Sequence, residues 1–241
     1  MRKVLVLTIL TAFLALSSFG SEKPLIYKVK RLKTDLVIDA NWNKPAWNRI
    51  KEIPITNFMG PVPNFQPVVK AKMQYDEENL YLIYKVEDRH VRIQTDKFNG
   101  PVSHDACVEF FFSPDEEWPL RYFNLEVNAG GTGLMAFQKD GTRTNVQEAD
   151  FKIVQIAHTL PKKLEQEVSE PVTWFLELKL PLRLLQKYSG VTKPAKGIVW
   201  KANFYKTSSR SSNPHYLTWS IVKNPKPQFH LPQFFGTLIF K

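Results

Sequence analysis

The chain has 241 residues, and 33 lysines and arginines against 23 aspartates and glutamates give it a formal net charge of +10. This length suffices to bury a core, and the single cysteine, Cys107, excludes an intramolecular disulfide. The basic residues are spread among acidic ones without a nucleic-acid reader motif, so we expect a solvated surface and no nucleic-acid partner. Attraction to an acidic polysaccharide or an anionic envelope remains the alternative use of the positive charge.

The N-terminus has the features of an export signal. A basic start, Met1–Lys3, precedes an apolar run, Val4–Leu16, and the small-x-small pattern Ser18–Gly20. The apolar run is shorter than the about 20 residues that a membrane span needs, although a short anchor is the alternative. We expect residues 1–20 to be a signal peptide and residues 21–241 to be a single domain. The mature chain should have no transmembrane segment and should be exported, to the periplasm or outside the cell.

Strand signals dominate the remaining chain. β-branched and aromatic runs bounded by Pro, Asn, Asp, Ser or Gly predict strands. The predicted strands are Val68–Tyr75, Asn79–Glu87, Val108–Ser113, Tyr122–Asn128, Gly133–Gln138, Phe151–Thr159, Val172–Leu180, Gly197–Lys206, Pro214–Ser220 and Phe229–Phe240. Only Pro45–Ile50 and Pro181–Tyr188 have helical patterns. The spacing predicts an all-β fold, an antiparallel β-sandwich with one or two short helices. Cys107 lies inside an apolar run, which predicts a buried thiol.

Several of these segments, in their order along the chain, resemble carbohydrate-binding module family 9. The segments are Leu36–Trp47 (LVIDANWNKPAW), Lys72–Asp88, His104–Phe112 (HDACVEFFF), Tyr122–Thr132 (YFNLEVNAGGT), Trp174–Leu180, Gly197–Tyr205 and Phe229–Phe240 (FHLPQFFGTLIF). The form is similar to the stand-alone members found in polysaccharide-degrading Bacteroidota. The resemblance implies a jelly-roll-like sandwich that binds sugars, often at chain ends, with structural calcium in some members. Trp42 and Trp47 are expected to pack under the sandwich.

The resemblance also implies a set of carbohydrate-binding residues. Phe229 corresponds to an aromatic platform that stacks on a sugar ring. The expected polar contacts are Glu109, Asn128 and Asn203, with His104, His230 and Lys206 near the rim. The chain departs from the family in two ways, because Val102–His104 offers no Trp for a second ring and Glu126 replaces an Arg. Trp118, Phe137 and Tyr216 are the other rings available to a sugar.

The expected function is that of an exported, non-catalytic carbohydrate-binding protein acting in polysaccharide recognition or degradation. No catalytic residue is assigned. The first alternative is a glycoside hydrolase, or a subunit of one, that uses Asp105 or Glu109 with Glu126 as paired carboxylates. The second alternative is a haem-binding sandwich that uses Met73 or Met135 with a histidine, or a purely structural sandwich. Core packing is the preferred use of both methionines.

A glycan is the expected ligand, and the sequence predicts no oligomeric state and no cofactor. The five histidines lie far apart without the spacing of zinc ligands. Calcium stays open, because Asp76–Asn79 and Asp88 supply oxygen atoms of the kind that it prefers. A solvated hairpin turn explains Asp76–Asn79 without any ion, and we prefer that interpretation.

Overall fold

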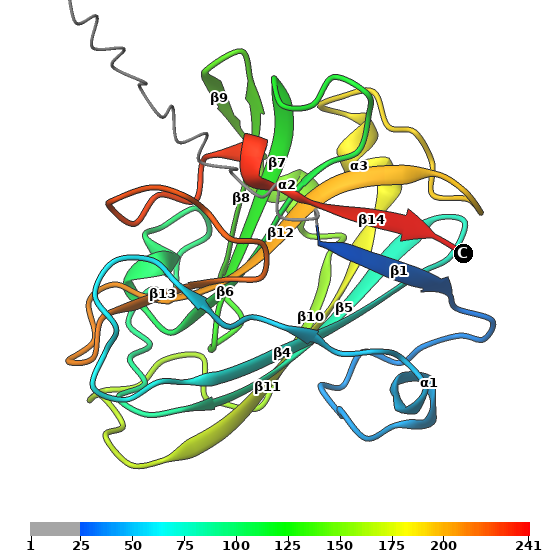
Figure 1. Ribbon diagram of the computed structural model, residues 1–241. Coiled ribbons are helices and arrows are strands. Elements are labelled where there is room, and N and C mark those ends of the chain that lie inside the picture. Colours follow the sequence, from blue (N-terminus) through cyan, green and yellow to red (C-terminus); the bar gives the residue numbers. More distant parts are fainter. Residues whose placement is uncertain (1–24) are drawn as a thin grey trace, which may run out of the picture.

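The computed structural model describes residues 25–241, so the expected signal peptide lies outside the described residues. Between residues 25 and 241 the chain forms fourteen strands, three short α-helices and two 3-10 turns (Figure 1). No helix in this range is long and apolar enough to cross a membrane.

The elements follow one another in chain order, and most of them are strands. They are β1 (Ile26–Arg31), α1 (Pro45–Asn48), β2 (Ile53–Pro54), β3 (Asn57–Phe58), β4 (Val68–Tyr75), β5 (Asn79–Asp88), η1 (Val102–His104), β6 (Cys107–Ser113), β7 (Arg121–Asn128), β8 (Gly133–Lys139), β9 (Thr142–Asn145), α2 (Glu148–Phe151), β10 (Gln155–His158), β11 (Val172–Pro181), α3 (Leu182–Gln186), β12 (Val199–Ser208), β13 (His215–Thr218), η2 (Pro232–Phe234) and β14 (Gly236–Phe240).

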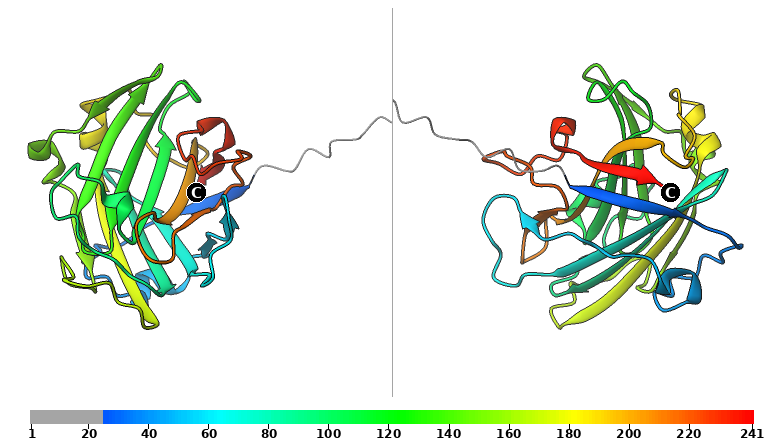
Figure 2. Two further views of the ribbon diagram at one scale, coloured as in Figure 1. Left: turned by 90° about the vertical axis from the view of Figure 1, so that its left-hand side faces the viewer. Right: turned by 45° about the vertical axis from the view of Figure 1, so that its right-hand side comes forward.

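The strands curl into two layers, which we name the front sheet and the back sheet (Figures 1 and 2). The front sheet has the order β14-β12-β6-β7-β8-β9, and the back sheet has the order β4-β5-β11-β10. Strand β1 pairs with both sheets, because Ile26–Val29 runs parallel to β14 while Lys30 and Arg31 run parallel to β4. The other pairings among the named strands are antiparallel. The structure confirms the predicted β-sandwich and adds the parallel pairing of β1.

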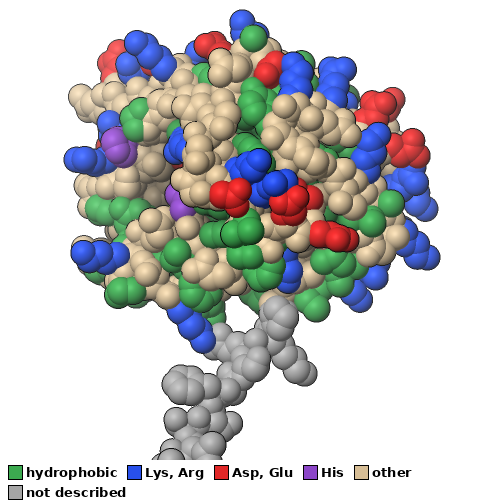
Figure 3. All heavy atoms as spheres, turned by 90° about the horizontal axis from the view of Figure 1, so that it is seen from above, with side chains coloured by type: hydrophobic (Ala, Val, Ile, Leu, Met, Phe, Trp, Pro, Cys, Tyr) green, Lys and Arg blue, Asp and Glu red, His purple; other side chains and the backbone are tan. Residues whose placement is uncertain are grey.

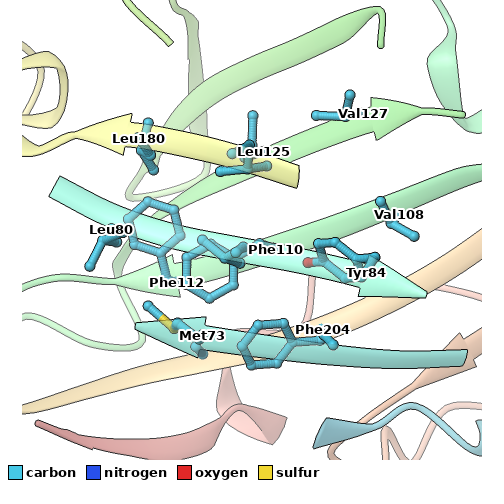
Figure 4. Close-up of a cluster of buried hydrophobic side chains, with 14 of the residues drawn as sticks. Met73, Leu80, Tyr84, Val108, Phe110, Phe112, Leu125, Val127, Leu180 and Phe204 are labelled. Atoms are coloured by element: carbon cyan, nitrogen blue, oxygen red, sulfur yellow. The ribbon is translucent and has the colours of Figure 1, made fainter. Parts of the chain in front are cut away.

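The core lies between the two sheets because side chains alternate along each strand. Phe110 and Phe112 of β6 point inward with Phe204 of β12, and the Phe110 ring lies 4.5 Å from Phe112 and 5.0 Å from Phe204 (Figure 4). Met73 and Met135 are buried in the same core, which confirms packing as their use. The alternation that places these rings inside also directs their neighbours in sequence to the outer face of the front sheet.

Glu177 of β11 fastens the segment before β2 to the outer face of the back sheet. Its buried carboxylate accepts hydrogen bonds from the backbone N–H groups of Asp39 and Ala40, both at 2.9 Å. It also accepts bonds from Lys44 Nζ and Trp47 Nε1, both at 2.8 Å. Trp47 is buried in a cluster outside the main core, which confirms the packing expected for the tryptophans of this segment.

The largest difference from the predicted elements lies near the C-terminus. The segment Phe229–Phe240 was expected to be one strand, but only Gly236–Phe240 forms β14. Pro232 begins the 3-10 turn η2, because proline has no N–H to donate to a sheet and its ring fixes the backbone. The loop 219–235 therefore leaves the sheet edge, and Phe229 lies on a loop. Helix α2 was also not expected.

Charged side chains of both signs are interspersed on the face shown in Figure 3. Ion pairs between exposed groups include Lys70 with Glu52 and Lys85 with Glu87. This arrangement supports the solvated basic surface expected from the sequence.

Candidate functional site

A pocket of about 290 Å³ opens on the outer face of the front sheet, where loop 219–235 approaches β6, β7 and β12. Aromatic rings, two carboxylates, hydroxyls and two histidines share its lining. The lining residues are Ser103, His104, Glu109, Phe111, Glu126, Thr207, Ser209, Tyr216, Pro227, Gln228, Phe229 and His230. Four of the expected site residues therefore meet in one place: Phe229, Glu109, His104 and His230.

The floor of the pocket comes from the strands of the front sheet. Glu109 of β6 lies directly opposite Glu126 of β7 in the antiparallel register, and opposite Tyr205 of β12 on its other side. Phe111 follows Glu109 by two positions and so faces the same way. The alternation of these three strands thus brings two carboxylates and two aromatic rings together on one surface.

Phe229 forms a wall of the pocket. Its ring stacks on Tyr205 with the centroids 4.2 Å apart and the planes 19° apart, and Tyr216 meets it edge-on at 6.2 Å. The Tyr205 hydroxyl donates a 3.2 Å hydrogen bond to the Phe229 carbonyl, which holds the loop on the strand. Phe229 is 9% exposed, since Tyr205 covers one of its faces. The ring therefore offers limited area to a ligand.

The two histidines reach the pocket from different segments. His104 ends the 3-10 turn η1, and its carbonyl accepts a 3.1 Å hydrogen bond from the Arg210 N–H. His230 lies on loop 219–235, with its Nδ1 2.9 Å from the Tyr122 hydroxyl. Burial, helped by the positive charge of Arg143, lowers the pKa of His230 to about 4. His230 is therefore neutral at neutral pH and exchanges uncharged hydrogen bonds only.

Asn128 does not line the pocket, because it closes the turn between β7 and β8. Its Oδ1 accepts a 2.9 Å hydrogen bond from the Thr132 N–H, and its Nδ2 donates to Asp105 Oδ2 at 3.0 Å. Asp105, a candidate carboxylate of the hydrolase alternative, is also outside the lining and pairs with Arg92. Gly131 of the same turn has a positive φ of 81°, and a Cβ there would lie 2.4 Å from the His158 ring. Asn128 and Gly131 therefore determine the shape of the turn between β7 and β8.

Asn203 is likewise occupied by the backbone. Its Nδ2 donates to the Ser220 carbonyl at 3.0 Å, and its Oδ1 accepts from the Ser220 N–H at 2.8 Å. These two bonds fasten the start of loop 219–235 to β12. Asn203 is buried and does not line the pocket, so it supports the loop that carries Phe229.

Lys206 was expected near the rim of the site, but it is fully buried and points to the core side of β12. Its Nζ lies 3.1 Å from Asp88 Oδ2 and 2.6 Å from His215 Nε2. The His215 Nδ1 is 2.8 Å from the Asn213 carbonyl, so Nδ1 is the donor and Nε2 accepts from the ammonium. Burial, together with the Lys206 charge, lowers the pKa of His215 to about 3. Lys206 is thus the cation of a buried network.

The two carboxyl groups of the pocket disturb each other. Glu109 and Glu126 are 3% and 6% exposed. Burial and the negative charge of Glu126 raise the pKa of Glu109 well above its usual range. Burial also raises the pKa of Glu126, although Asn124, which donates a 3.0 Å hydrogen bond to it, opposes the rise. The pair therefore retains protons at a pH where ordinary glutamates have lost them.

Glu126→Gln should stabilise the protein at high pH. Both carboxyl groups bind protons more tightly in the folded chain than in the unfolded chain, so their contribution to stability declines as the pH rises above about 4.5. At about pH 8 the variant should gain about 1 kcal/mol of unfolding free energy and about 2–4 °C in Tm. At about pH 4 the two proteins should melt together.

Thermal denaturation from about pH 4 to pH 8 checks this expectation. The lowered pKa values of His215 and His230 make both proteins less stable as the pH falls below about 6.5, whereas the carboxyl pair makes the parent less stable as the pH rises. Because the histidines affect both proteins equally, the Tm difference between them reports on the carboxyl pair. A difference that does not change with pH would contradict the assignment.

The residues considered for calcium have other partners. The Asp76 carboxylate accepts 2.8 and 2.7 Å hydrogen bonds from the Glu78 and Asn79 N–H groups, which is the expected hairpin turn. Asp88 pairs with Lys206, and the ten-residue strand β5 separates it from Asp76. Between residues 25 and 241, no group of three His, Cys, Asp or Glu side chains is placed to hold a metal. The donors do not fit a shared calcium ion.

Several lining residues were not predicted from the sequence, and Phe111 and Thr207 are the clearest of them. Each follows a residue of the outer face, Glu109 or Tyr205, by two positions, so strand alternation would have identified both. Ser103 and Ser209 carried no such signal. They meet because the Ser209 N–H and hydroxyl both donate to the Ser103 carbonyl, at 3.0 and 2.9 Å.

A β-sandwich with a small pocket of aromatic rings, carboxylates and hydroxyls has the composition of a binding site for a small polar molecule. The sequence model of carbohydrate-binding family 9 matches residues 40–240. The chain therefore belongs to carbohydrate-binding family 9. No curated protein matches it.

Solved structures agree with this family. A candidate carbohydrate-binding protein from Bacteroides uniformis is 28% identical, with a TM-score of 0.81, and the match covers 91% of this chain and 100% of that one. A family 9 module from Caldicellulosiruptor kristjanssonii in complex with cellotriose is 15% identical with a TM-score of 0.61, covering 90% and 94%. A structure of such a module from the same organism with glucose is 16% identical with a TM-score of 0.58, covering 89% and 96%. These neighbours share the β-sandwich fold.

Proposed function

We propose that the protein is an exported, non-catalytic carbohydrate-binding protein that acts in polysaccharide recognition or degradation. The pocket on the front sheet holds one sugar unit of its glycan. The observation that carries this proposal is a pocket of about 290 Å³ that joins the Phe229 ring to buried carboxylates and hydroxyls. Family membership supports it, as do the relatives solved with cellotriose and glucose.

The pocket offers both kinds of contact that a sugar needs. An aromatic ring that covers roughly 100 Å² of apolar sugar surface contributes about 2.5 kcal/mol. Millimolar affinity already needs about 4 kcal/mol, so one partly covered ring does not suffice. Glu109, Glu126 and the hydroxyls of Ser103, Thr207 and Ser209 supply hydrogen bonds worth about 1 kcal/mol each. We expect modest affinity for a single sugar unit.

Export follows from the N-terminal pattern of the sequence. The segment from Ser21 to Lys241 would be the mature chain and one domain, located in the periplasm or outside the cell. Intact-mass measurement of the exported product tests this part of the proposal. A product that retains Met1–Gly20 would contradict it.

Phe229→Leu should weaken glycan binding at least about ten-fold, because it removes the ring while keeping an apolar side chain of similar volume against Tyr205. The matched control is Phe175→Leu, which alters a partly buried ring beside the Trp47 cluster, outside the pocket lining. A glycan array first identifies the ligand, and calorimetry on that ligand then compares the three proteins. Equal affinities for the parent and Phe229→Leu would show that the ligand does not bind in this pocket. An array without any hit would overturn carbohydrate binding.

The hydrolase alternative would use the same two glutamates. Glycosidases place their carboxyl groups on either side of the scissile bond, about 5 Å apart or more. Glu109 and Glu126 are neighbours across one strand pair and belong to a single floor, which favours binding over hydrolysis. Release of reducing ends from the glycan that binds, abolished by Glu109→Gln, would establish the alternative.

A further inference from the structure

The floor of the pocket holds two carboxyl groups that no lysine or arginine of the described chain pairs with. Glu109 and Glu126 are directly opposite on β6 and β7. Like charges at such positions destabilise a sheet, and burial adds to that cost. No lysine or arginine is among the described residues that line this pocket.

Glu109 is the less satisfied of the two. Glu126 accepts a hydrogen bond from Asn124 Nδ2 at 3.0 Å. For the Glu109 carboxylate, the part of the chain from residue 25 onward provides neither a hydrogen-bond donor nor an ion pair, although only 3% of the residue is exposed. Because Glu109 lines the pocket, solvent or a ligand there has to supply the donor that such an acceptor has in folded proteins.

Two cations act electrostatically on the carboxyl pair, Lys206 on Glu109 and Arg143 on Glu126, without contacting it. Lys206 pairs with Asp88 on the core side of β12. Arg143 of β9 donates through Nε to Asn145 Oδ1 at 2.9 Å. Neither forms an ion pair with Glu109 or Glu126, so in the free pocket a bound proton is what lowers the charge of the two carboxyl groups.

The aromatic residues that line the pocket suit a cation as well. Phe111, Tyr216 and Phe229 present aromatic rings, which attract a positive charge through their quadrupoles. His230 does not compete, because its lowered pKa keeps it neutral at neutral pH. A compact donor of several hydrogen bonds with a positive charge would satisfy both carboxylates and contact these rings.

We infer that the pocket selects a sugar that carries a protonated amine, a hexosamine whose amino group is free. The ammonium group would lie between Glu109 and Glu126, while the sugar ring contacts Phe229. This inference rests on the proposed function, since it names the sugar class for the same site. The raised pKa values of the two carboxyl groups agree with it, because they reflect a pocket without its cation.

Calorimetry with matched monosaccharides tests the inference on the purified protein. Glucose, galactose and mannose would each be titrated in three forms, with a hydroxyl, an acetamido group or a free amine at carbon 2. For at least one sugar, the free amine should bind at least about ten-fold more tightly than both other forms. Glu109→Gln and Glu126→Gln should lower this preference at least about ten-fold. Glu148→Gln, at an exposed glutamate outside the lining, should leave it unchanged.

The possible failures are distinguishable. Equal affinity for the three forms of a sugar would keep the sugar site and overturn the amine inference. Tighter binding of a neutral form would do the same. No binding of any monosaccharide, together with a blank glycan array, would overturn the proposed function and this inference with it. A saturable calcium site that Glu109→Gln abolishes would assign the carboxyl pair to a metal and overturn the inference alone.

Discussion

Glu177→Ala should lower the free energy of unfolding by about 3–5 kcal/mol. Four donors converge on this buried carboxylate: the Asp39 and Ala40 N–H groups, Lys44 Nζ and Trp47 Nε1. The substitution leaves the two backbone N–H groups and Trp47 Nε1 without a partner, while Lys44 keeps its 2.7 Å bond to Asp39. It also opens a cavity, and each loss adds to the cost. The segment that carries Trp47 should detach from the back sheet before the core unfolds.

Two measurements check this result. Urea denaturation gives the change in unfolding free energy, and hydrogen exchange at Ala40 and the Trp47 indole reports detachment of the segment. Glu87→Ala is the matched control, because Glu87 is a half-exposed glutamate that pairs with Lys85 at the surface. The control should change stability by less than about 1 kcal/mol. A Glu177→Ala protein as stable as the control would show that these four contacts do not hold the segment.

Lys206→Met should also destabilise the protein by about 3–5 kcal/mol, with a Tm lower by roughly 10 °C. Asp88 is 2% exposed, and although burial opposes its ionisation, Lys206 and His215 lower its pKa overall. Removing the ammonium leaves a buried carboxylate without its cation and leaves the His215 Nε2 without its donor. The Asp88 carboxylate would then be buried away from water without a cation to compensate, and this accounts for most of the lost unfolding free energy.

A double substitution separates the charge from the packing. Asp88→Asn combined with Lys206→Met removes both charges, and it should recover more than half of the lost stability. Lys70→Met is the control, since Lys70 and Glu52 form an exposed pair that should contribute less than about 1 kcal/mol. If the double variant were no more stable than Lys206→Met, packing around the lysine stem would be the cause and the ion pair would not.

Most of the fold followed from patterns that the sequence displays locally. Strand β4 has the predicted bounds, and β5 and β11 differ from theirs by one residue, because their apolar runs end at clear turn residues. Strand β1 was not predicted, although Tyr27 and Val29 alternate with exposed residues, because the pattern is short and its partners β14 and β4 lie elsewhere in the sequence. Partners distant in sequence decide whether such a strand forms.

The site residues also differ in how far local sequence patterns determine their positions. Glu109 reached the pocket as predicted because the alternation of β6 fixes its direction. Asn128 and Asn203 also point to the outer face of the front sheet, as Glu109 does. They do not line the pocket, because the backbone N–H groups of Thr132 and Ser220 bond to their side chains, and the sequence does not reveal the course of those two turns. Lys206 is different, because the alternation that directs Tyr205 outward already directs its neighbour inward.

The pairing of β1 with β14 determines when this protein can finish folding. Ile26 lies beside Thr237, roughly 210 positions later in the chain. Closing a loop of that length costs entropy before any contact repays it, and folds that depend on such distant pairings form slowly, in about milliseconds to seconds. In a chain that emerges N-terminus first, Lys30 and Arg31 can pair with β4 early, but Ile26–Val29 has no partner until β14 appears. The strand that joins the two sheets can therefore be completed only after β14 has been synthesised.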